Sequence, residues 1–284
     1  IYAFPLNFAY YFGNLAQFVP EQLLGLSNAP FAALFARSVY ALMTTLSDDR
    51  NMKILAVLIA FGVPIFGLHI WIPFPDLGGL AFALIGLYLV LTQKQDEPLK
   101  LFLAGAALGL AFGFKLLHLI PAALLPLIIM ARMTPISATK VQMIKALSLY
   151  SLGFLLLAGF WLLRNWVLFD NPVYPANLPI IGTLLSWPNA PDVDYANRQF
   201  TEHIWVTSSA KWLVYPWIES HFSRADFTGS SGLGLGFAAL YPLALFTIGA
   251  SIFTLHKSWH ARLTSKDNVL RTNQVLLSLI AILT

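Results

Sequence analysis

Apolar stretches recur along almost the whole chain, and each approaches the ~20 residues that a helix needs to cross the hydrocarbon core of a bilayer. Hydrophobic residues make up 58% of the 284 and charged residues 11%, and the mean hydropathy is +0.70. A soluble domain carries roughly 25% charged residues, and its core could not absorb so many apolar segments. We therefore predict an integral membrane protein, an all-α polytopic bundle of transmembrane helices.

The predicted transmembrane helices fall into two groups separated by an external cap loop at 169–232. Their spans, with boundaries good to a few residues, are 31–46, 54–68, 78–92, 101–116, 117–131, 146–168, 233–255 and 275 onward. The first group occupies residues 31–168 and the second 233–284, and several spans are short, as in re-entrant helices. Residues 1–30 are aromatic, Pro-punctuated and free of Lys and Arg, which favours an external juxtamembrane segment with amphipathic helices.

Segment 101–131 decides the topology, because it could form one long helix or two short helices that meet at a tip near Lys115 and His118. With two helices, one side of the membrane receives the connections that hold most of the 17 Lys and Arg, as the positive-inside rule requires. Those connections are 47–53, 93–100, 132–145 and the linker 256–271. A single helix would bury Lys115 in mid-bilayer at a cost of about several kcal/mol, and Pro121 and Pro126 also favour a break. We predict two helices, with the basic connections in the cytoplasm.

This topology gathers the polar candidate residues on one side of a bacterial inner or plasma membrane, outside the cytoplasm. The segments expected there are 1–30, 69–77, the tip at 115–118 and 164–232. Asp76 lies in the second of them, within LHIWIPFPDLGG. Its carboxylate could act as a general base or a cation ligand, or it could cap the following helix, whose dipole favours a negative charge at that end.

Lys115 and His118 are three residues apart and hence share one helical face. A cation at this depth is costly unless it is paired, so an anionic ligand would explain both residues. The alternative is a lysine that snorkels to the headgroups beside a passive histidine. Gly105, Gly109 and Gly113 clear one face of the same helix and predict close helix packing.

Arg164 and Asn165 end an apolar helix just before DNPVYP. A guanidinium that emerges there can clamp a phosphate with two hydrogen bonds. The alternative is an interfacial arginine in an aromatic belt with Trp161 and Trp166. Arg37 lies within an apolar segment and needs a partner that the sequence does not name.

No metal site and no nucleic-acid partner are predicted. The chain has no cysteine, which excludes disulfides and thiolate chemistry. The acidic and imidazole side chains outside the motifs above are interpreted as solvated turns, helix caps or isolated histidines; they are Asp48, Asp49, Asp192, Asp194, His203 and His221. No cofactor is required, and a need for a divalent metal is left open.

Five motifs follow one another along nearly the whole chain. They are Tyr2, Phe4 and Pro5; Pro64 followed by Asp76; the glycine-rich helix that ends in Lys115; RNWVLFDNPVYP at 164–175; and Gly232, Gly234 and Gly236. In this order they resemble the GT-C superfamily of membrane glycosyltransferases, which includes protein mannosyltransferases and the aminoarabinose transferases that act on lipid A.

The resemblance implies a GT-C-type bundle that transfers a sugar, with inversion, from a polyprenyl-phosphate carrier to an acceptor outside the cytoplasm. Asp76 would be the acidic residue of the second external loop and is expected to be catalytic, and Lys115 and Arg164 would hold the lipid phosphate. Fixed cations at a low-dielectric interface stabilise the negative charge that a leaving phosphate gains. The substrate-binding residues are then expected to be Lys115, His118, Arg164, Asn165 and Tyr174. Partners would be membrane lipids and the lipid-linked donor.

The general base of such enzymes is an aspartate of the first external loop, upstream of the element at residues 2–5, and the chain begins too late to contain it. Ala3 also stands where relatives tend to have histidine. We therefore expect a piece of a longer polypeptide, inactive unless that aspartate precedes Ile1. A second hypothesis is a non-catalytic GT-C-like structural or lipid-binding subunit, with other membrane subunits as partners.

Overall fold

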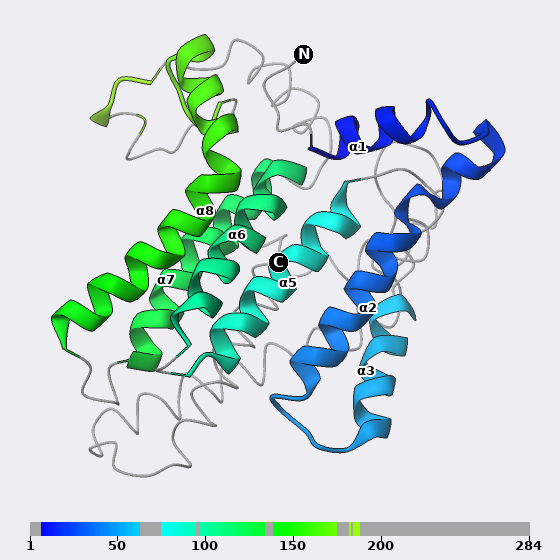
Figure 1. Cartoon of the computed structure of the whole chain (residues 1–284), viewed down its shortest axis with the longest axis horizontal. Coiled ribbons are helices and arrows are strands. Elements are labelled where there is room, and N and C mark those ends of the chain that lie inside the picture. Colours follow the sequence, from blue (N-terminus) through cyan, green and yellow to red (C-terminus); the bar gives the residue numbers. More distant parts are fainter. Residues whose placement is uncertain are drawn as a thin grey trace, which may run out of the picture.

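The computed structural model describes residues 7–62, 75–94, 97–133, 139–174, 182 and 184–187. All regular structure over these residues is helical (Figure 1), which confirms the predicted all-α class for this part of the chain. The helices are α1 (Asn7–Leu15), η1 (Glu21–Asn28), α2 (Ala29–Met43), α3 (Arg50–Gly62), α5 (Asp76–Thr92), α6 (Pro98–Phe114), η2 (Leu116–His118), α7 (Leu119–Met133) and α8 (Lys140–Phe169). Elements η1 and η2 are 3₁₀ helices. The spans predicted at 233–255 and 275 onward lie outside the described residues.

The break predicted near Lys115 is confirmed. Helix α6 ends at Phe114, and the backbone of Lys115 is extended, with φ −154° and ψ 131°. The chain then passes through η2 into α7, which runs back along α6 (Figure 1). Pro121 fits the first turn of α7, where its missing N–H would have had no helical partner, whereas Pro126 lies inside that helix.

Helix α8 begins at Lys140, earlier than the span predicted at 146–168. A capping box fixes this start: the Gln142 N–H donates to Thr139 Oγ1 at 3.3 Å, and Gln142 Oε1 accepts from the Thr139 N–H at 2.8 Å. The first turns of α8 are polar, so hydropathy alone places the start of the helix too late.

Helices α6 and α8 run in parallel and approach each other through glycine. A side chain at Gly105 would collide with the backbone carbonyl of Tyr150, and one at Gly153 would collide with that of Phe102. Gly109 faces the backbone of α8 in the same way. The packing role predicted for Gly105 and Gly109 is therefore confirmed, and it lets two helix backbones come into direct contact.

Three clusters of buried apolar side chains form the core of the described residues. The largest lies between α5, α6, α7 and α8 and includes Leu87, Val90, Leu108, Leu125 and Ile128. A second joins α2 to α5 and consists of Ala32, Phe35, Leu77 and Ala81. The third lies between α6 and α8 and consists of Phe112, Ala158 and Trp161. Because α5 is packed on both sides, its first turn is held firmly in place.

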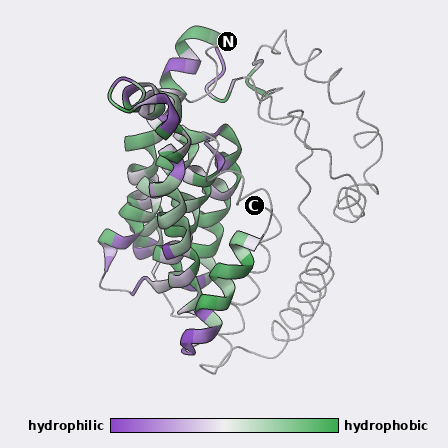
Figure 2. Cartoon of the chain, turned by 90° about the vertical axis from the view of Figure 1, so that its right-hand side faces the viewer, coloured by the Kyte–Doolittle hydropathy of each residue, from purple (hydrophilic) through white to green (hydrophobic). Residues whose placement is uncertain are grey.

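The outer face of α8 is apolar and uncovered by the rest of the described chain. Leu156, Phe160 and Leu163 are 65%, 66% and 61% exposed, and Figure 2 shows that hydrophobic residues predominate along the helices. Two helical segments, Leu116–Met133 and Lys140–Phe169, are long and apolar enough to cross a membrane. Soluble proteins rarely expose so large a contiguous apolar surface.

The connection between α5 and α6 is closed by Lys100. Its ammonium lies 2.8 Å from the carboxylate of Glu97 and donates to the Thr92 carbonyl at 3.2 Å. The hydrogen bond from Lys100 is the main reason why the pKa of Glu97 lies below its ordinary value. The end of α5 and the start of α6 are thereby tied together.

Two residues near α3, Asp49 and Arg37, have partners that the structure identifies. The Asn51 N–H donates to Asp49 Oδ1 at 2.8 Å, so Asp49 caps the start of α3 as predicted. The guanidinium carbon of Arg37 lies 5.9 Å from the ring centroid of Tyr40, and the ammonium of Lys53 lies 5.9 Å from the same centroid. Tyr40 is thus a partner of Arg37 that the sequence did not name.

Candidate functional site

Asp76 is the first residue of α5, directly after Pro75. Its side chain is 33% exposed, and its position at the N-terminus of the helix favours the charged carboxylate through the helix dipole. Asp76 Oδ1 accepts a hydrogen bond from the ammonium of Lys115, with which it forms an ion pair. Asp76 therefore both begins α5, where its negative charge is favourable, and pairs with Lys115, another of the candidate residues.

Lys115 reaches Asp76 because α6 stops immediately before it. An extended residue after the last helical turn projects its side chain away from the α6 axis, and here it crosses to the start of α5. The Lys115 side chain is 45% exposed, so water and ligands have access to the ion pair.

His118 lies against the same turn of α5. The ring occupies the space that a side chain at Gly79 would fill, and Phe114 occupies the space beside Gly78. Asp76 and Gly79 lie one turn apart on α5, whereas Lys115 is extended and, contrary to the prediction, does not share a helical face with His118. Two successive contacts nevertheless join the first turn of α5 to the tip of the hairpin. The structure brings together Asp76, Lys115 and His118, three of the residues that the sequence singled out.

Helix α1 packs over this end of the bundle. The indole N–H of Trp161 on α8 donates to Asn7 Oδ1 at 2.9 Å, and the Asn7 amide lies against Gly113 of α6. Phe8 and Phe31 pack against the ring of Phe114, with centroids 6.0 and 5.2 Å away. Sequence reasoning assigned no role to Asn7, because an asparagine in an aromatic segment carries no spacing signal.

The second predicted cation, Arg164, lies one helical turn beyond Trp161 on α8. Its guanidinium carbon is 5.9 Å from the Trp161 ring centroid, and Nη1 donates to Asn165 Oδ1 at 3.1 Å. Because α6 and α8 run in parallel, Arg164 and Lys115 belong to the same end of the bundle. Trp161 connects the two groups, since it contacts both Arg164 and Asn7.

Asn165 holds the turn that follows α8. It is fully buried, and its amide donates to the Tyr174 carbonyl at 3.0 Å. Asp170 ends the helix in the left-handed conformation (φ 52°), and the ring of Tyr174 stacks on that of Phe169 with centroids 4.3 Å apart. The backbone of Tyr174 and the side chain of Asn165 thus shape the loop, while their role in substrate binding remains a prediction.

The described residues contain no group of three His, Asp or Glu side chains that could hold a metal ion. Asp192, Asp194, His203 and His221 lie outside these residues, as do the motifs at 2–5 and 232–236. Comparison with protein-family models, curated proteins and solved structures found no match.

Proposed function

We propose that this chain is a membrane-embedded glycosyltransferase of the GT-C type, which moves a sugar from a polyprenyl-phosphate carrier to an acceptor outside the cytoplasm. The observation that carries the proposal is the partly exposed ion pair between Asp76 and Lys115, with His118 beside it. A carboxylate and a cation at the mouth of an apolar bundle suit a ligand that has a phosphate head and an apolar tail.

The membrane setting is supported by the exposed apolar face of α8 and by where the basic residues fall. The start of α3, the end of α5, the start of α6, the end of α7 and the start of α8 lie at the end of the bundle opposite to α1 and the start of α5 (Figure 1). The basic residues at this end include Arg50, Lys94, Arg132 and Lys140. The positive-inside rule then puts that end in the cytoplasm and Asp76 outside.

In the proposed chemistry, Lys115 binds the phosphate of the sugar donor. During transfer the bond from the sugar C1 to the phosphate oxygen breaks, and its electron pair stays on the phosphate. The acceptor hydroxyl attacks C1 from the opposite face and loses its proton to a base. A fixed ammonium in a medium of low dielectric constant stabilises the phosphate that departs. Before the donor binds, Asp76 keeps Lys115 in position.

A second candidate function has one specific observation in its favour. Asp76 and Lys115 neutralise each other, and a carboxylate at a helix N-terminus is stabilising without any ligand. The pair would then simply lock α5 to α6 in a non-catalytic lipid-binding or structural subunit of a larger membrane complex.

Donor binding by the purified full chain in detergent tests the first function. With polyprenyl phosphate as the probe, Lys115→Ala should weaken binding about tenfold or more, the equivalent of about 1.4 kcal/mol. Lys140→Ala, an exposed lysine at the opposite end of the bundle, is the matched control and should bind as the native chain does. Equal binding by all three proteins would refute the donor site.

The two functions are separated by exchanging the charges in an Asp76→Lys, Lys115→Asp double variant. The exchanged pair can still form, so a purely structural lock should lose only about 0.3–1 kcal/mol, the amount that the carboxylate gains at the N-terminus of α5, and should leave any binding of polyprenyl phosphate unchanged. A donor site should keep most of the stability but lose phosphate binding, because a carboxylate then stands where the ammonium was. Co-purification of stoichiometric partners without transferase activity would support the subunit hypothesis.

A further inference from the structure

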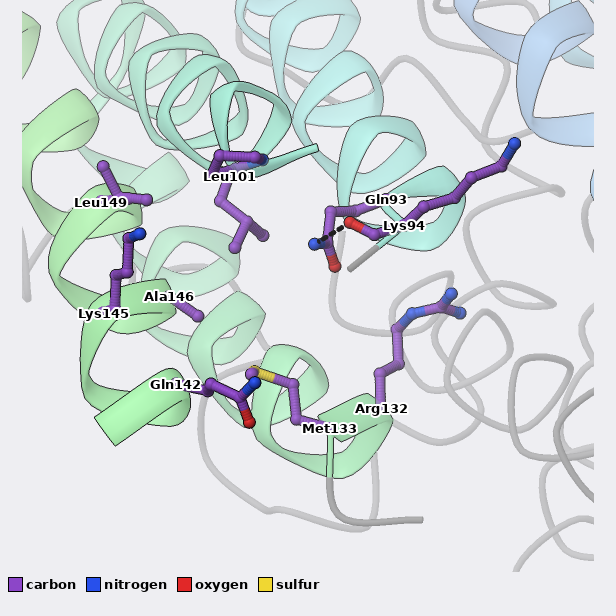
Figure 3. Close-up of a pocket in the computed structure, with 10 residues that line it drawn as sticks. Gln93, Lys94, Leu101, Arg132, Met133, Gln142, Lys145, Ala146 and Leu149 are labelled. Carbon is purple, nitrogen blue, oxygen red and sulfur yellow. Dashed lines mark hydrogen bonds between the residues drawn. The ribbon is translucent and has the colours of Figure 1, made fainter. Parts of the chain in front are cut away.

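A pocket of about 280 Å³ lies at the opposite end of the bundle, between the α5–α6 connection, the end of α7 and the start of α8 (Figure 3). Its volume is slightly below the roughly 300–1,000 Å³ of sites for small molecules, so it suits a headgroup better than a large soluble ligand. The ion pair of Asp76 is far along the helices from it, and the proposed transferase chemistry does not use it.

Over the described residues, the charged side chains that line the pocket are all basic. Lys145 of α8 and Arg132 of α7 line it from two sides, and Lys94 extends outward at its rim (Figure 3). None of its lining residues among the described parts of the chain is acidic. Glu97, an acid of the neighbouring turn that the structure describes, is engaged by Lys100 at 2.8 Å. Over the described ranges, Lys145 forms no hydrogen bond or ion pair.

Amide groups add donors beside the cations. Gln93 and Gln142 both line the pocket, and Gln93 already donates one N–H of its amide to the Lys94 carbonyl (Figure 3). The carbonyl of Gln142 is used in the capping box with Thr139, which leaves its NH₂ group to donate. Cations and N–H donors without an acid are the groups that bind a phosphate.

The surroundings of the pocket indicate a lipid rather than a free phosphate. Leu101 and Leu149 form apolar parts of its wall. On the same turns of α8 as Gln142 and Lys145, Val141 and Ile144 are 74% and 64% exposed. A headgroup in the pocket would therefore have apolar surface beside it for the acyl chains.

We propose that this pocket binds the phosphate headgroup of an anionic phospholipid from the leaflet at the basic end of the bundle. Basic pockets between membrane helices bind acidic headgroups through this combination of charge and apolar surface. The inference rests on the membrane setting of the proposed function, but not on sugar transfer.

Native mass spectrometry of the full chain in detergent tests the proposal, with phosphatidylglycerol as the probe and zwitterionic phosphatidylcholine as the reference. Lys145→Ala should lower the affinity for phosphatidylglycerol about fivefold, as expected for one basic residue at an anionic headgroup. Lys145→Arg, which keeps the charge, should restore it. Lys140→Ala lies on another face of α8 and should bind as the native chain does. Equal retention of the lipid by the native chain and by Lys145→Ala would overturn the proposal.

Two further measurements show whether the phosphate belongs to a lipid or is free, and distinguish this pocket from the donor site at Lys115. Glycerol phosphate should compete poorly, because it lacks acyl chains; competition at the same concentration as the lipid would overturn the lipid assignment. Lys115→Ala should leave phosphatidylglycerol binding unchanged while it weakens polyprenyl phosphate binding. Loss of both ligands in Lys115→Ala would show that the basic pocket is not a separate site.

Discussion

The hydroxyl of Tyr150 donates a hydrogen bond of 2.7 Å to the carbonyl of Ala122, in the buried contact between α8 and α7. Pro126 lies inside α7, and its nitrogen cannot donate to the carbonyl four residues earlier, which is that of Ala122. The side chain of one helix therefore replaces the backbone bond that proline removes from another.

Tyr150→Phe should lower the free energy of unfolding by about 1 kcal/mol, because the Ala122 carbonyl loses its donor in a dry environment. The cost should shrink when Pro126→Ala restores the N–H that this carbonyl needs. Unfolding in detergent of the two single variants and the double variant measures the coupling. An equal cost in both backgrounds would contradict this account.

Gly105→Ala should destabilise the chain by about 1–3 kcal/mol, because the added methyl group meets the backbone carbonyl of Tyr150 and forces α6 and α8 apart. The matched control is Gly159→Ala on α8, where a side chain would meet nothing within 4 Å. That change should be neutral or stabilise the helix by up to about 1 kcal/mol. Melting temperatures of both variants, measured in one detergent, check the contrast.

Trp161→Phe should loosen α1, since it removes the hydrogen bond to Asn7 that fastens this helix to α8. Amide hydrogen exchange over residues 7–15 should accelerate, while exchange within α6 stays slow. Trp166→Phe serves as the control because Trp166 is 60% exposed. The same exchange rate in both variants would show that the indole bond does not hold α1.

Asn165→Ala and Arg164→Ala should separate a structural role from a binding role. Loss of the buried Asn165 amide leaves the Tyr174 carbonyl without its donor and should cost about 1–3 kcal/mol of stability. Arg164→Ala removes a cation–π contact and should cost less than about 1 kcal/mol, yet weaken the binding of polyprenyl phosphate. Thermal unfolding and donor binding, measured on both variants, test this; a stable Asn165→Ala protein would contradict it.

The sequence was sufficient to predict the hairpin tip, because an unpaired lysine in mid-bilayer is costly and the distribution of basic residues excludes a single long helix. The distribution of basic residues also predicted Asp76 and Lys115 on one side of the membrane, and the structure brings the two side chains into contact. Both predictions depend on the cost of placing a charge inside the bilayer, which follows from the position of that charge in the sequence. They do not depend on how the helices are rotated.

The rotation of each helix about its own axis could not be predicted from the sequence. Helices α5 and α6 are apolar nearly all round, so no stripe indicates which face meets which neighbour. The bond between Trp161 and Asn7 joins residues 154 positions apart, and the bond from Tyr150 to Ala122 depends on the register of two packed helices. For the same reason Asn165 was predicted from its motif as a ligand-binding residue, while its bond to the Tyr174 backbone was not foreseen.

The antiparallel pair α5 and α6 is fastened at both ends, by Lys100 to the Thr92 carbonyl at one and by Lys115 to Asp76 at the other. These two contacts differ, because the acceptor of the first is a backbone carbonyl. The acceptor of the second is a carboxylate, which an arriving anion can displace. An anion that draws Lys115 away would therefore free only the Asp76 carboxylate, because Leu77 stays buried and the His118 ring stays against Gly79.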